Sequence, residues 1–563
     1  MTERSSRALL AAAVAAACAA FFLVYSFLPL TAPARFNSPD ETSNAFFARL
    51  FAAKSVLWTV EPLNLVIKEG LVHPRSVKVV DNFLVPGGFL GLPVLYGTAA
   101  KVLGDRAIPF MTPLFAVGAA LAWGILWSRR FGRRVGIAAG ALLLVQPAWW
   151  YSASRTLQPN VLFAALAIFS ACLFFVAPVR AAIERRKLEG LRLLRLTDAA
   201  LAGMLLGLAV WVRMSEAYWI ALGIIVLVVA ARPKVPWARL AVFAATAAFT
   251  LVPLFIMHSA VYGDAFATGY GNGLAVPAGE LPHGMGERLL GPLRPVLFPL
   301  GFAPRAALAH FWTYGIAFFG WWSALVACAG AAYLADKRLA RKKWPRDAAV
   351  FGAFSLAVAL WLALFYGSWN VQDNPDPAAV TIGSSYIRYW LPIAALSTLP
   401  VAWLVTRASE RFAGRKRVLF AAAFIVCAAA ASAADVFWSP GEGLLAVRST
   451  LRRYDAVVAR ILALTPKNSL VVADSADKYI FPDRPVMTPL RAEENYAALA
   501  VIKRHAYIYY YGITFPQQDL DWLRGEKLPP LGLSIDPVEA FGEETLYKLP
   551  STDPRDPQQV LQP

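Results

Sequence analysis

The sequence predicts a multi-pass α-helical membrane protein with about 11 transmembrane helices and a small C-terminal external α/β domain. Of its 563 residues, 58% are hydrophobic and only 16% are charged, and the mean hydropathy is +0.51. Soluble globular chains are far less apolar. The apolar residues fall into stretches long enough to cross a bilayer, and the basic residues lie in short connections between these stretches.

The net charge of +18 does not indicate a nucleic-acid-binding protein, because the basic residues are not spread over one soluble domain. They cluster in five short connections between hydrophobic segments, as the positive-inside rule expects of cytoplasmic loops. We therefore predict no nucleic-acid partner and place all five connections in the cytoplasm. They are residues 129–134, 180–195, 232–239, 337–346 and 407–417.

The first hydrophobic stretch, about residues 8–30, is long enough to span and has no evident small-residue cleavage site. It is therefore predicted to be a retained helix whose N-terminus lies in the cytoplasm. All four cysteines fall inside hydrophobic segments, so neither a disulfide framework nor a cysteine-based metal site is expected. They are Cys18, Cys172, Cys328 and Cys427.

Residues 83–103 are apolar enough to be taken for a second span, but two features argue against it. The segment contains several Gly and Pro residues, which make a poor continuous helix. A crossing here would also put the basic connection 129–134 on the outside. We therefore predict that the segment lies along the outer membrane surface or re-enters it, so that residues 31–106 form one long external loop.

Ten further spans follow from the apolar stretches, and the two between residues 199 and 231 are short enough to form a shallow or tilted hairpin. After the last span, residues 438–563 are predicted to form the external domain. Within it, Ser469–Ala473 and Ala506–Tyr511 have the pattern of strands, residues 491–504 that of a helix, and the Pro-rich end that of a loose tail. The ten spans are 107–128, 135–152, 161–179, 199–212, 217–231, 240–260, 307–334, 348–366, 389–406 and 418–437.

Two adjacent carboxylates, Asp40 and Glu41, follow the first predicted span. Asn37 or Ser38 can cap a helix at this point, Pro39 suits its first turn, and a helix N-terminus favours anions. An acidic helix start is therefore one interpretation. A functional site is the other, because the pair lies at the mouth of a large hydrophobic bundle.

Polar and aromatic side chains gather in the other predicted external connections. Arg213 lies at the tip of the short hairpin, and it either pairs with Glu216 at i, i+3 or serves a site, because a cation at this depth needs a partner. Arg388 precedes a late span, either as an anchor in an interfacial aromatic belt or as a second site cation. Residues 261–306 form a Gly- and Pro-rich external connection that is long enough to be a lid or binding loop.

Three motifs resemble those of GT-C superfamily glycosyltransferases of the protein O-mannosyltransferase and aminoarabinose transferase type. Pro39-Asp40-Glu41-Thr42 matches the Asp-Glu motif that opens the first external loop of the aminoarabinose transferases. Arg388-Tyr389-Trp390-Leu391-Pro392 resembles the Arg-Tyr-x-x-Pro signature near a late span, and Gly263-Asp264 to Thr268-Gly269-Tyr270 resembles a loop common in related bacterial sequences. The resemblance covers residues 1–437 and implies a GT-C-like transmembrane catalytic domain there.

The resemblance implies a membrane glycosyltransferase that moves a sugar from a polyprenyl-phosphate donor to a protein, lipid or glycan acceptor at the outer face of the membrane, with inversion. Such a reaction needs a carboxylate base for the acceptor hydroxyl and cations for the leaving phosphate. Asp40 is the candidate base and Glu41 an orienting group, while Arg213 and Arg388 are candidate donor-phosphate residues. Further candidate substrate-binding residues are His73, Arg75, Asn160, Tyr270 and Tyr386.

The implied partners are the polyprenyl-phosphate sugar, its acceptor and membrane lipid. No cofactor is assigned, and a requirement for a divalent metal is left open. The implied location is the cell (plasma or inner) membrane, with the active site and the C-terminal domain on the external, or periplasmic, side.

The sequence departs from the family pattern in two places. The second external loop has Gln158-Pro159-Asn160 where the family often has an Asp, and Val85-Pro86 replaces the juxtamembrane Lys-Pro of the aminoarabinose transferases, with His73-Pro74-Arg75 as a candidate replacement. The competing class is a multi-pass transporter or flippase, but this chain has few charges in the middle of its spans, where ion-coupled transporters need them. An inactive lipid-binding or scaffold protein is the third alternative.

Overall fold

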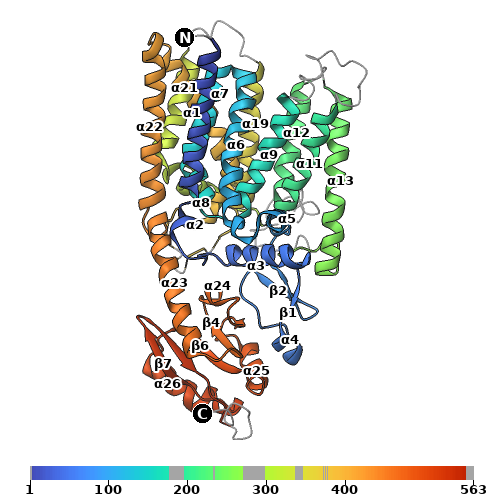
Figure 1. The fold of residues 1–563 in the computed structure, drawn as a ribbon, viewed down its shortest axis with the longest axis vertical. Coiled ribbons are helices and arrows are strands. Elements are labelled where there is room, and N and C mark those ends of the chain that lie inside the picture. The colour runs from blue at the N-terminus through green and yellow to red at the C-terminus, as the bar shows by residue number, and fades with distance from the viewer. Residues whose placement is uncertain are drawn as a thin grey trace. The chain divides into compact units, whose positions relative to one another are not determined.

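The structure is a computed structural model that describes residues 3–176, 196–231, 235–270, 298, 300–336, 346–371, 373–374, 376 and 378–552. The chain divides into two compact units, and many of their elements are labelled in Figure 1. The first unit comprises Met1–Leu30, Pro109–Phe255 and Asn272–Ala446, and the second comprises Thr31–Ile108, Ile256–Gly271 and Val447–Pro563. Each unit is therefore assembled from segments that are far apart in the sequence.

The first unit is built of apolar helices. Among the described residues, six helices are long and apolar enough to cross a membrane, or up to eight if each of two bent pairs is one span. Three shorter apolar helices cover Ala11–Tyr25, Thr197–Val212 and Met214–Ala230. The multi-pass α-helical membrane class is confirmed, and the number of 11 spans stays a prediction. The helices are α1 (Glu3–Tyr25), α2 (Phe27–Thr31), α6 (Ile108–Phe131), α7 (Arg133–Val145), α8 (Pro147–Ser154), α9 (Pro159–Val176), α11 (Thr197–Val212), α12 (Ala217–Ala231), α13 (Trp237–Tyr262), α16 (Pro304–His310), α17 (Gly320–Ala335), α19 (Arg346–Gly367), α20 (Ser385–Tyr389), α21 (Leu391–Ser409) and α22 (Gly414–Trp438).

Two of the predicted spans are bent. α7 and α8 meet at 52°, and the helical segment Pro304–Ala317 meets α17 at 91°. The first bend has a local cause, because Pro147 has no amide hydrogen to continue α7. Gln146 caps the new helix instead, its Oε1 accepting a hydrogen bond of 2.7 Å from the Trp149 amide. The predicted span 135–152 is thus two helices joined at a proline.

Small residues hold α9, α11 and α13 close together. A Cβ at Gly203 would lie 2.2 Å from the Phe243 carbonyl oxygen, and one at Gly207 would lie 2.9 Å from that of Ala247. On the other side of α11, Ser170 Oγ donates to the Ala202 carbonyl at 2.7 Å. Close backbone approach at small residues is typical of helix pairs in membranes.

The first loop, residues 31–106, folds into helices and a small sheet in the second unit. Its helices are α3 (Pro39–Lys54), α4 (Pro62–Ile67) and α5 (Gly91–Leu103), and its three antiparallel strands have the order β1 (Thr59–Val60), β3 (Phe83–Pro86), β2 (Val77–Val80). Asp81 and Asn82 have φ of 49° and 69°, as the tight turn between β2 and β3 requires. The segment 83–103 is therefore a strand followed by a short helix, and α5 is not among the helices long enough to span.

The C-terminal part of the second unit is a mixed sheet flanked by helices. The strand order is β5 (Val486–Met487), β4 (Ser469–Ala473), β6 (Tyr507–Ile513), β8 (Glu544–Lys548), β7 (Asp536–Phe541), with β5, β4 and β6 parallel and the last two pairings antiparallel. The predicted strands at 469–473 and 506–511 and the helix near 491–504 are present. The other helices here are α23 (Leu444–Leu464), α24 (Asp477–Ile480), α25 (Glu493–Ile502) and α26 (Gln517–Trp522).

One hydrophobic core joins the first loop to the C-terminal sheet. Leu63, Ile67 and Val72 of the loop are buried in the same cluster as Leu470 of β4 and Ile508 of β6. The sequence analysis assigned residues 31–106 to the transmembrane domain, whereas in the structure they share this core with residues 447–552. The predicted loose tail, residues 553–563, lies outside the described residues.

Candidate functional site

The two adjacent carboxylates at the start of α3 have different surroundings. Glu41 is 3% exposed, and its Oε2 accepts a hydrogen bond of 3.2 Å from the backbone amide of the N-cap residue Ser38. This contact is half of a capping box, which satisfies an amide that the helix itself cannot. The acidic helix-start interpretation is therefore confirmed for Glu41.

Asp40 is half-buried and contacts a different segment. Its Oδ1 accepts a hydrogen bond of 2.6 Å from Ser76 Oγ, at the start of β2. Ser76 has φ of 60°, a region that few non-glycine residues adopt, and its carbonyl accepts from the Gly87 amide at 2.9 Å. A Cβ at Gly87 would lie only 2.6 Å from that carbonyl group, so a glycine is needed there. The backbone around Ser76 is thus held tightly while its hydroxyl faces Asp40.

The loop that begins at Gly263 packs beside the same strand. Tyr262 donates its hydroxyl to the Pro86 carbonyl at 2.8 Å, and a Cβ at Gly269 would lie 2.3 Å from the carbonyl carbon of Gly87. The ring of Tyr270 lies 5.0 Å from that of Phe89. Tyr270 is thus brought to the end of β3, next to the segment that contacts Ser76. Residues 271–297 and 299 of the predicted lid lie outside the described residues.

The predicted substrate contacts His73 and Arg75 have partners within the second unit. Arg75 binds the fully buried Asp477, with Nη2 2.6 Å from Oδ1 and its backbone amide 2.7 Å from Oδ2. His73 Nδ1 lies 2.9 Å from the Pro74 carbonyl oxygen. Arg75 therefore has a structural partner, and the substrate roles of both residues stay predictions.

In the first unit, Arg213 belongs to a buried polar network. Its Nε donates to Glu216 Oε1 at 2.8 Å, and the two side chains are only 6% and 2% exposed. Its Nη2 donates to the Tyr366 hydroxyl at 2.9 Å, and that hydroxyl donates to Glu216 at 2.6 Å. Trp219 Nε1 also donates to Glu216, at 2.6 Å. The predicted i, i+3 pair between Arg213 and Glu216 is confirmed.

Arg388 lies against the same aromatic ring as Arg213. The two guanidinium carbons lie 5.5 and 4.9 Å, respectively, from the centre of the Tyr389 ring. Arg388 Nη2 also donates to Ser385 Oγ at 2.7 Å, and Ser385 in turn donates to Asp373. The structure therefore brings together the two residues predicted to bind the donor phosphate.

Asn160 and Tyr386 lie beside Arg388. Asn160 Nδ2 donates to the Arg388 carbonyl at 3.1 Å, while its buried Oδ1 has no hydrogen-bond partner among the described residues. Tyr386 donates to the Trp369 carbonyl at 2.5 Å, and burial raises the pKa of its hydroxyl to about 12, so it is neutral at physiological pH. In the first unit Asn160, Arg213 and Arg388 thus form one cluster, and Tyr386 lies two positions before Arg388 in α20.

Arg155 was not predicted from the sequence as a site residue, and it lies buried in the second loop of this unit. Arg155 is 3% exposed, and its Nη1 donates to the Tyr151 hydroxyl at 2.9 Å. Tyr151 in turn donates to the Glu442 carbonyl at 2.9 Å. The sequence does contain a signal for Arg155, because it is an arginine between two apolar segments. A cation buried at such a place needs polar partners and is therefore a candidate for a structural or functional role.

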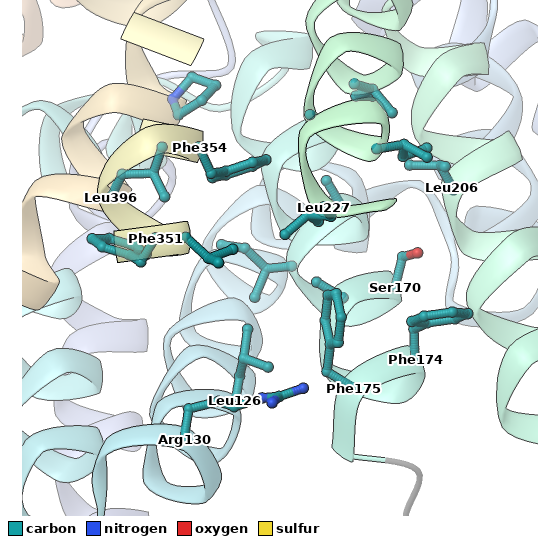
Figure 2. A pocket seen from close by; sticks show the side chains of 18 of the residues that line it. Leu126, Arg130, Ser170, Phe174, Phe175, Leu206, Leu227, Phe351, Phe354 and Leu396 are labelled. Atoms are coloured by element: carbon teal, nitrogen blue, oxygen red, sulfur yellow. The ribbon is translucent and has the colours of Figure 1, made fainter. Parts of the chain in front are cut away.

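A cavity of about 600 Å³ opens among α6, α9, α12, α13, α19 and α21 of the first unit. Figure 2 shows aromatic and aliphatic side chains on its walls, with Arg130 near one end. The cavity follows α9 from Phe163 to Phe175, a rise of about 18 Å for a helix. Trp219 and Pro392 line it near Phe163, at the beginnings of α12 and α21. This end therefore adjoins the segments that carry Arg213 and Arg388.

The donor groups in the described residues do not fit a metal centre. Within those residues, no group of three or more His, Cys, Asp or Glu side chains is arranged to hold an ion. The Asp40 carboxylate accepts a hydrogen bond from a serine hydroxyl, and all four cysteines are free thiols.

Comparison with known proteins identifies the fold. No family model and no curated protein matches the sequence. The structure resembles ArnT from Cupriavidus metallidurans bound to undecaprenyl phosphate, with a TM-score of 0.57 and 13% identity over 97% of this chain and 98% of that one. It also resembles the archaeal oligosaccharyltransferase AglB from Archaeoglobus fulgidus in complex with an inhibitory peptide and a dolichol-phosphate, with a TM-score of 0.51 and 12% identity over 90% of this chain and 69% of that one. The expected GT-C fold is confirmed.

Proposed function

We propose that this protein is a membrane glycosyltransferase that transfers a sugar from a polyprenyl-phosphate donor to an acceptor hydroxyl. One observation carries the proposal: a long apolar cavity runs to the segments that hold two neighbouring arginines, Arg213 and Arg388. A prenyl chain needs an apolar channel, and a phosphate needs cations with directed hydrogen-bond donors. The undecaprenyl phosphate and dolichol-phosphate held by the two similar structures have this combination of tail and head group.

The proposed reaction is a single displacement. The acceptor oxygen forms a bond to the anomeric carbon while the bond from that carbon to the phosphate oxygen breaks. The acceptor proton passes to the Asp40 carboxylate, and polyprenyl phosphate leaves with the bonding electron pair. Arg388 and Arg213 stabilise the charge that develops on the leaving phosphate. Attack from the side opposite the phosphate inverts the anomeric centre.

The two carboxylates are suited to different parts of this scheme. Glu41 is buried and caps α3, which fixes the start of the helix. Asp40 is half-buried, does not cap the helix, and accepts a hydrogen bond from Ser76. Asp40 is therefore the proposed base, and Glu41 is proposed to orient the helix that carries it.

The deciding experiment is mass spectrometry of lipid-linked sugars and surface glycans from cells with and without the protein. If the protein is a glycosyltransferase, the surface glycan differs between the two kinds of cell, and the unused donor accumulates in the cells without the protein. A transporter or flippase moves a lipid-linked sugar without making a new glycosidic bond, so purified protein in vesicles would yield no new product. Unchanged glycans and unchanged lipid-linked sugars would contradict the proposal.

Arg388→Ala is expected to weaken the binding of undecaprenyl phosphate about 10- to 100-fold, because hydrogen bonds to charged groups contribute about 1.5–3 kcal/mol. Arg388→Lys should recover only part of this loss, since lysine lacks the planar fork. Binding is measured as the rise in Tm when undecaprenyl phosphate is added to the protein in detergent, with undecaprenol as the phosphate-free comparison. Arg407→Ala is the matched control, because Arg407 lies in the last turn of α21 and pairs with Asp336.

The proposed orientation, with the first loop and C-terminal domain external, can be tested by labelling. A cysteine placed at Lys101 is expected to react with a membrane-impermeant reagent added outside intact cells, whereas a cysteine at Arg133 is expected to react only after the cells are opened. The positive-inside rule is the reason, since Arg133 lies in a basic connection and α5 is not long enough to span. Labelling of both positions from the same side would contradict this topology.

A further inference from the structure

The C-terminal sheet has a feature that usually marks a ligand site. Strand β4 lies between two parallel neighbours, with β5 on one side and β6 on the other. The chain leaves β4 toward β5 and later returns to the opposite side at β6. In open parallel sheets, ligands bind at such a switch point, beside the carboxyl end of the strands. Here the segment after β4 begins at Asp474 and continues into α24.

At this switch point the structure places a side chain from the first loop. Arg75 Nε lies 3.0 Å from Asp477 Oδ1, Nη2 lies 2.6 Å from the same oxygen, and the Arg75 amide donates to Oδ2 at 2.7 Å. Nη2 also donates to the Ser475 carbonyl at 2.9 Å. Asp477 is 0% exposed, so this charge depends on Arg75 for compensation. The contact is thus a specific clamp that joins segments 402 residues apart.

The next residue of the first loop is Ser76, the partner of Asp40. Because the Arg75 backbone amide is itself bound to Asp477, the clamp fixes the main chain directly before Ser76. Ser76 has φ of 60° and donates to Asp40 Oδ1 at 2.6 Å. The orientation of the Ser76 hydroxyl therefore depends on a backbone conformation that serine rarely adopts unless the surrounding structure holds it.

The same short helix, α24, also holds the other side of this hydrogen bond. Thr42 lies two positions after Asp40 in α3, and its Oγ1 donates to the Lys478 carbonyl at 2.6 Å. Asp477 and Lys478 are adjacent in α24, so one residue holds the Ser76 segment and the next holds the Asp40 helix. α24 is thus bound to both segments that carry the Asp40–Ser76 pair.

We propose that the C-terminal domain positions the catalytic base through this clamp, with Asp477, Arg75 and Ser76 as positioning residues. The domain sets the orientation of the Asp40 carboxylate and leaves the binding of the donor lipid to the first unit. This inference rests on the proposed function, because it assigns Asp40 the role of base. In such sheets a ligand usually binds at the switch point, and here Arg75 of the same chain occupies that position.

Two variants test the proposal. Ser76→Gly removes the hydroxyl but suits φ of 60°, so it removes the contact with Asp40 without adding backbone strain. Asp477→Asn keeps the shape of the side chain and removes the charge that holds Arg75. Each is expected to lower the yield of glycan product per amount of membrane protein about 10- to 100-fold. The reason is that a shift of about 1 Å in the position of a reacting group can slow a reaction by about this much. The rise in Tm caused by undecaprenyl phosphate is expected to stay at the wild-type value.

Glu539→Gln is the matched control. Glu539 on β7 forms a bidentate ion pair with Arg460, with Nη2 2.6 Å from Oε2, as Asp477 does with Arg75. It lies at the edge of the sheet, with β6 and β8 between β7 and β4. This variant loses an ion pair of the C-terminal domain without touching the clamp, so its glycan yield is expected to equal that of the wild type.

The outcomes separate this inference from the proposed function. If Asp40→Asn is inactive while Ser76→Gly and Asp477→Asn both give wild-type glycan yields, the positioning role is wrong and the glycosyltransferase stands. If Asp40→Asn keeps full activity, the assignment of the base and the positioning role both fail. If Asp477→Asn does not fold, Ser76→Gly decides alone. A purely structural clamp would lower Tm, glycan yield and undecaprenyl phosphate binding together, which would also overturn the proposal.

Discussion

Asp40→Asn is expected to lower sugar transfer by about 100- to 10,000-fold, because an amide cannot accept the acceptor's proton. The structure gives reasons to expect a folded variant. The capping contact of α3 is made by Glu41 and not by Asp40, and an asparagine oxygen can still accept the hydrogen bond from Ser76. The measurement is glycan product in membranes that contain equal amounts of wild-type and variant protein.

Glu41→Gln is the control for this prediction. Glutamine can also fill the third position of a capping box, so the variant should remain folded and lose much less activity than Asp40→Asn. A small loss would agree with a role in orienting α3. Normal turnover by Asp40→Asn would remove Asp40 as the base, and a larger loss from Glu41→Gln than from Asp40→Asn would exchange the two roles.

Arg213→Ala is expected to lower the free energy of unfolding by about 3–5 kcal/mol, because it leaves a buried carboxylate without its cation. Glu216 has a side chain that is 2% exposed, and Arg213 supplies its charge compensation. Tyr366 and Trp219 still donate to Glu216 in this variant, but neutral donors do not replace the charge. The expected result is a lower Tm in detergent and less protein in the membrane.

The double variant Arg213→Met with Glu216→Gln separates stability from donor binding. It removes both charges of the buried pair and keeps a side-chain oxygen that can accept from Tyr366 and Trp219, so the Tm should recover. If Arg213 also binds the phosphate, undecaprenyl phosphate binding should stay weak in the stable double variant. Arg213→Ala with a wild-type Tm would contradict the dependence of Glu216 on this arginine.

Local sequence pattern was sufficient for the long apolar helices and for part of the sheet. Long apolar stretches indicated candidate spans, and runs such as Ser469–Ala473 indicated a buried strand, because both signals come from neighbours in the chain. The hairpin β7–β8 was missed because its strands are partly polar. β7 is an exposed edge strand, and β8 begins with Glu544 and ends with Lys548 on either side of its buried residues. α23 was missed because its strong amphipathic pattern directly follows the last apolar helix.

The sequence selects single polar residues more readily than it does their partners far away in the chain. Arg213 and Glu216 are three positions apart, so their pairing was predicted and is confirmed. Ser76 and Asp477 are ordinary polar residues in the sequence, and their importance appears only when the fold brings them to Asp40 and Arg75. Long-range pairs of this kind leave no periodic pattern in the sequence, because serine and aspartate are also common on solvent-exposed surfaces.

The shared core of the first loop and the C-terminal sheet has a consequence for biosynthesis. A ribosome makes about 5–20 residues per second, so Asp477 emerges roughly 20 to 80 seconds after Arg75, given the 402 residues between them. During this interval Leu63 and Ile67 lack the C-terminal sheet that covers them in the folded protein. The clamp that we propose positions Asp40 can therefore form only after β4 and α24 have been made, and a chain truncated before β4 is expected to lack it.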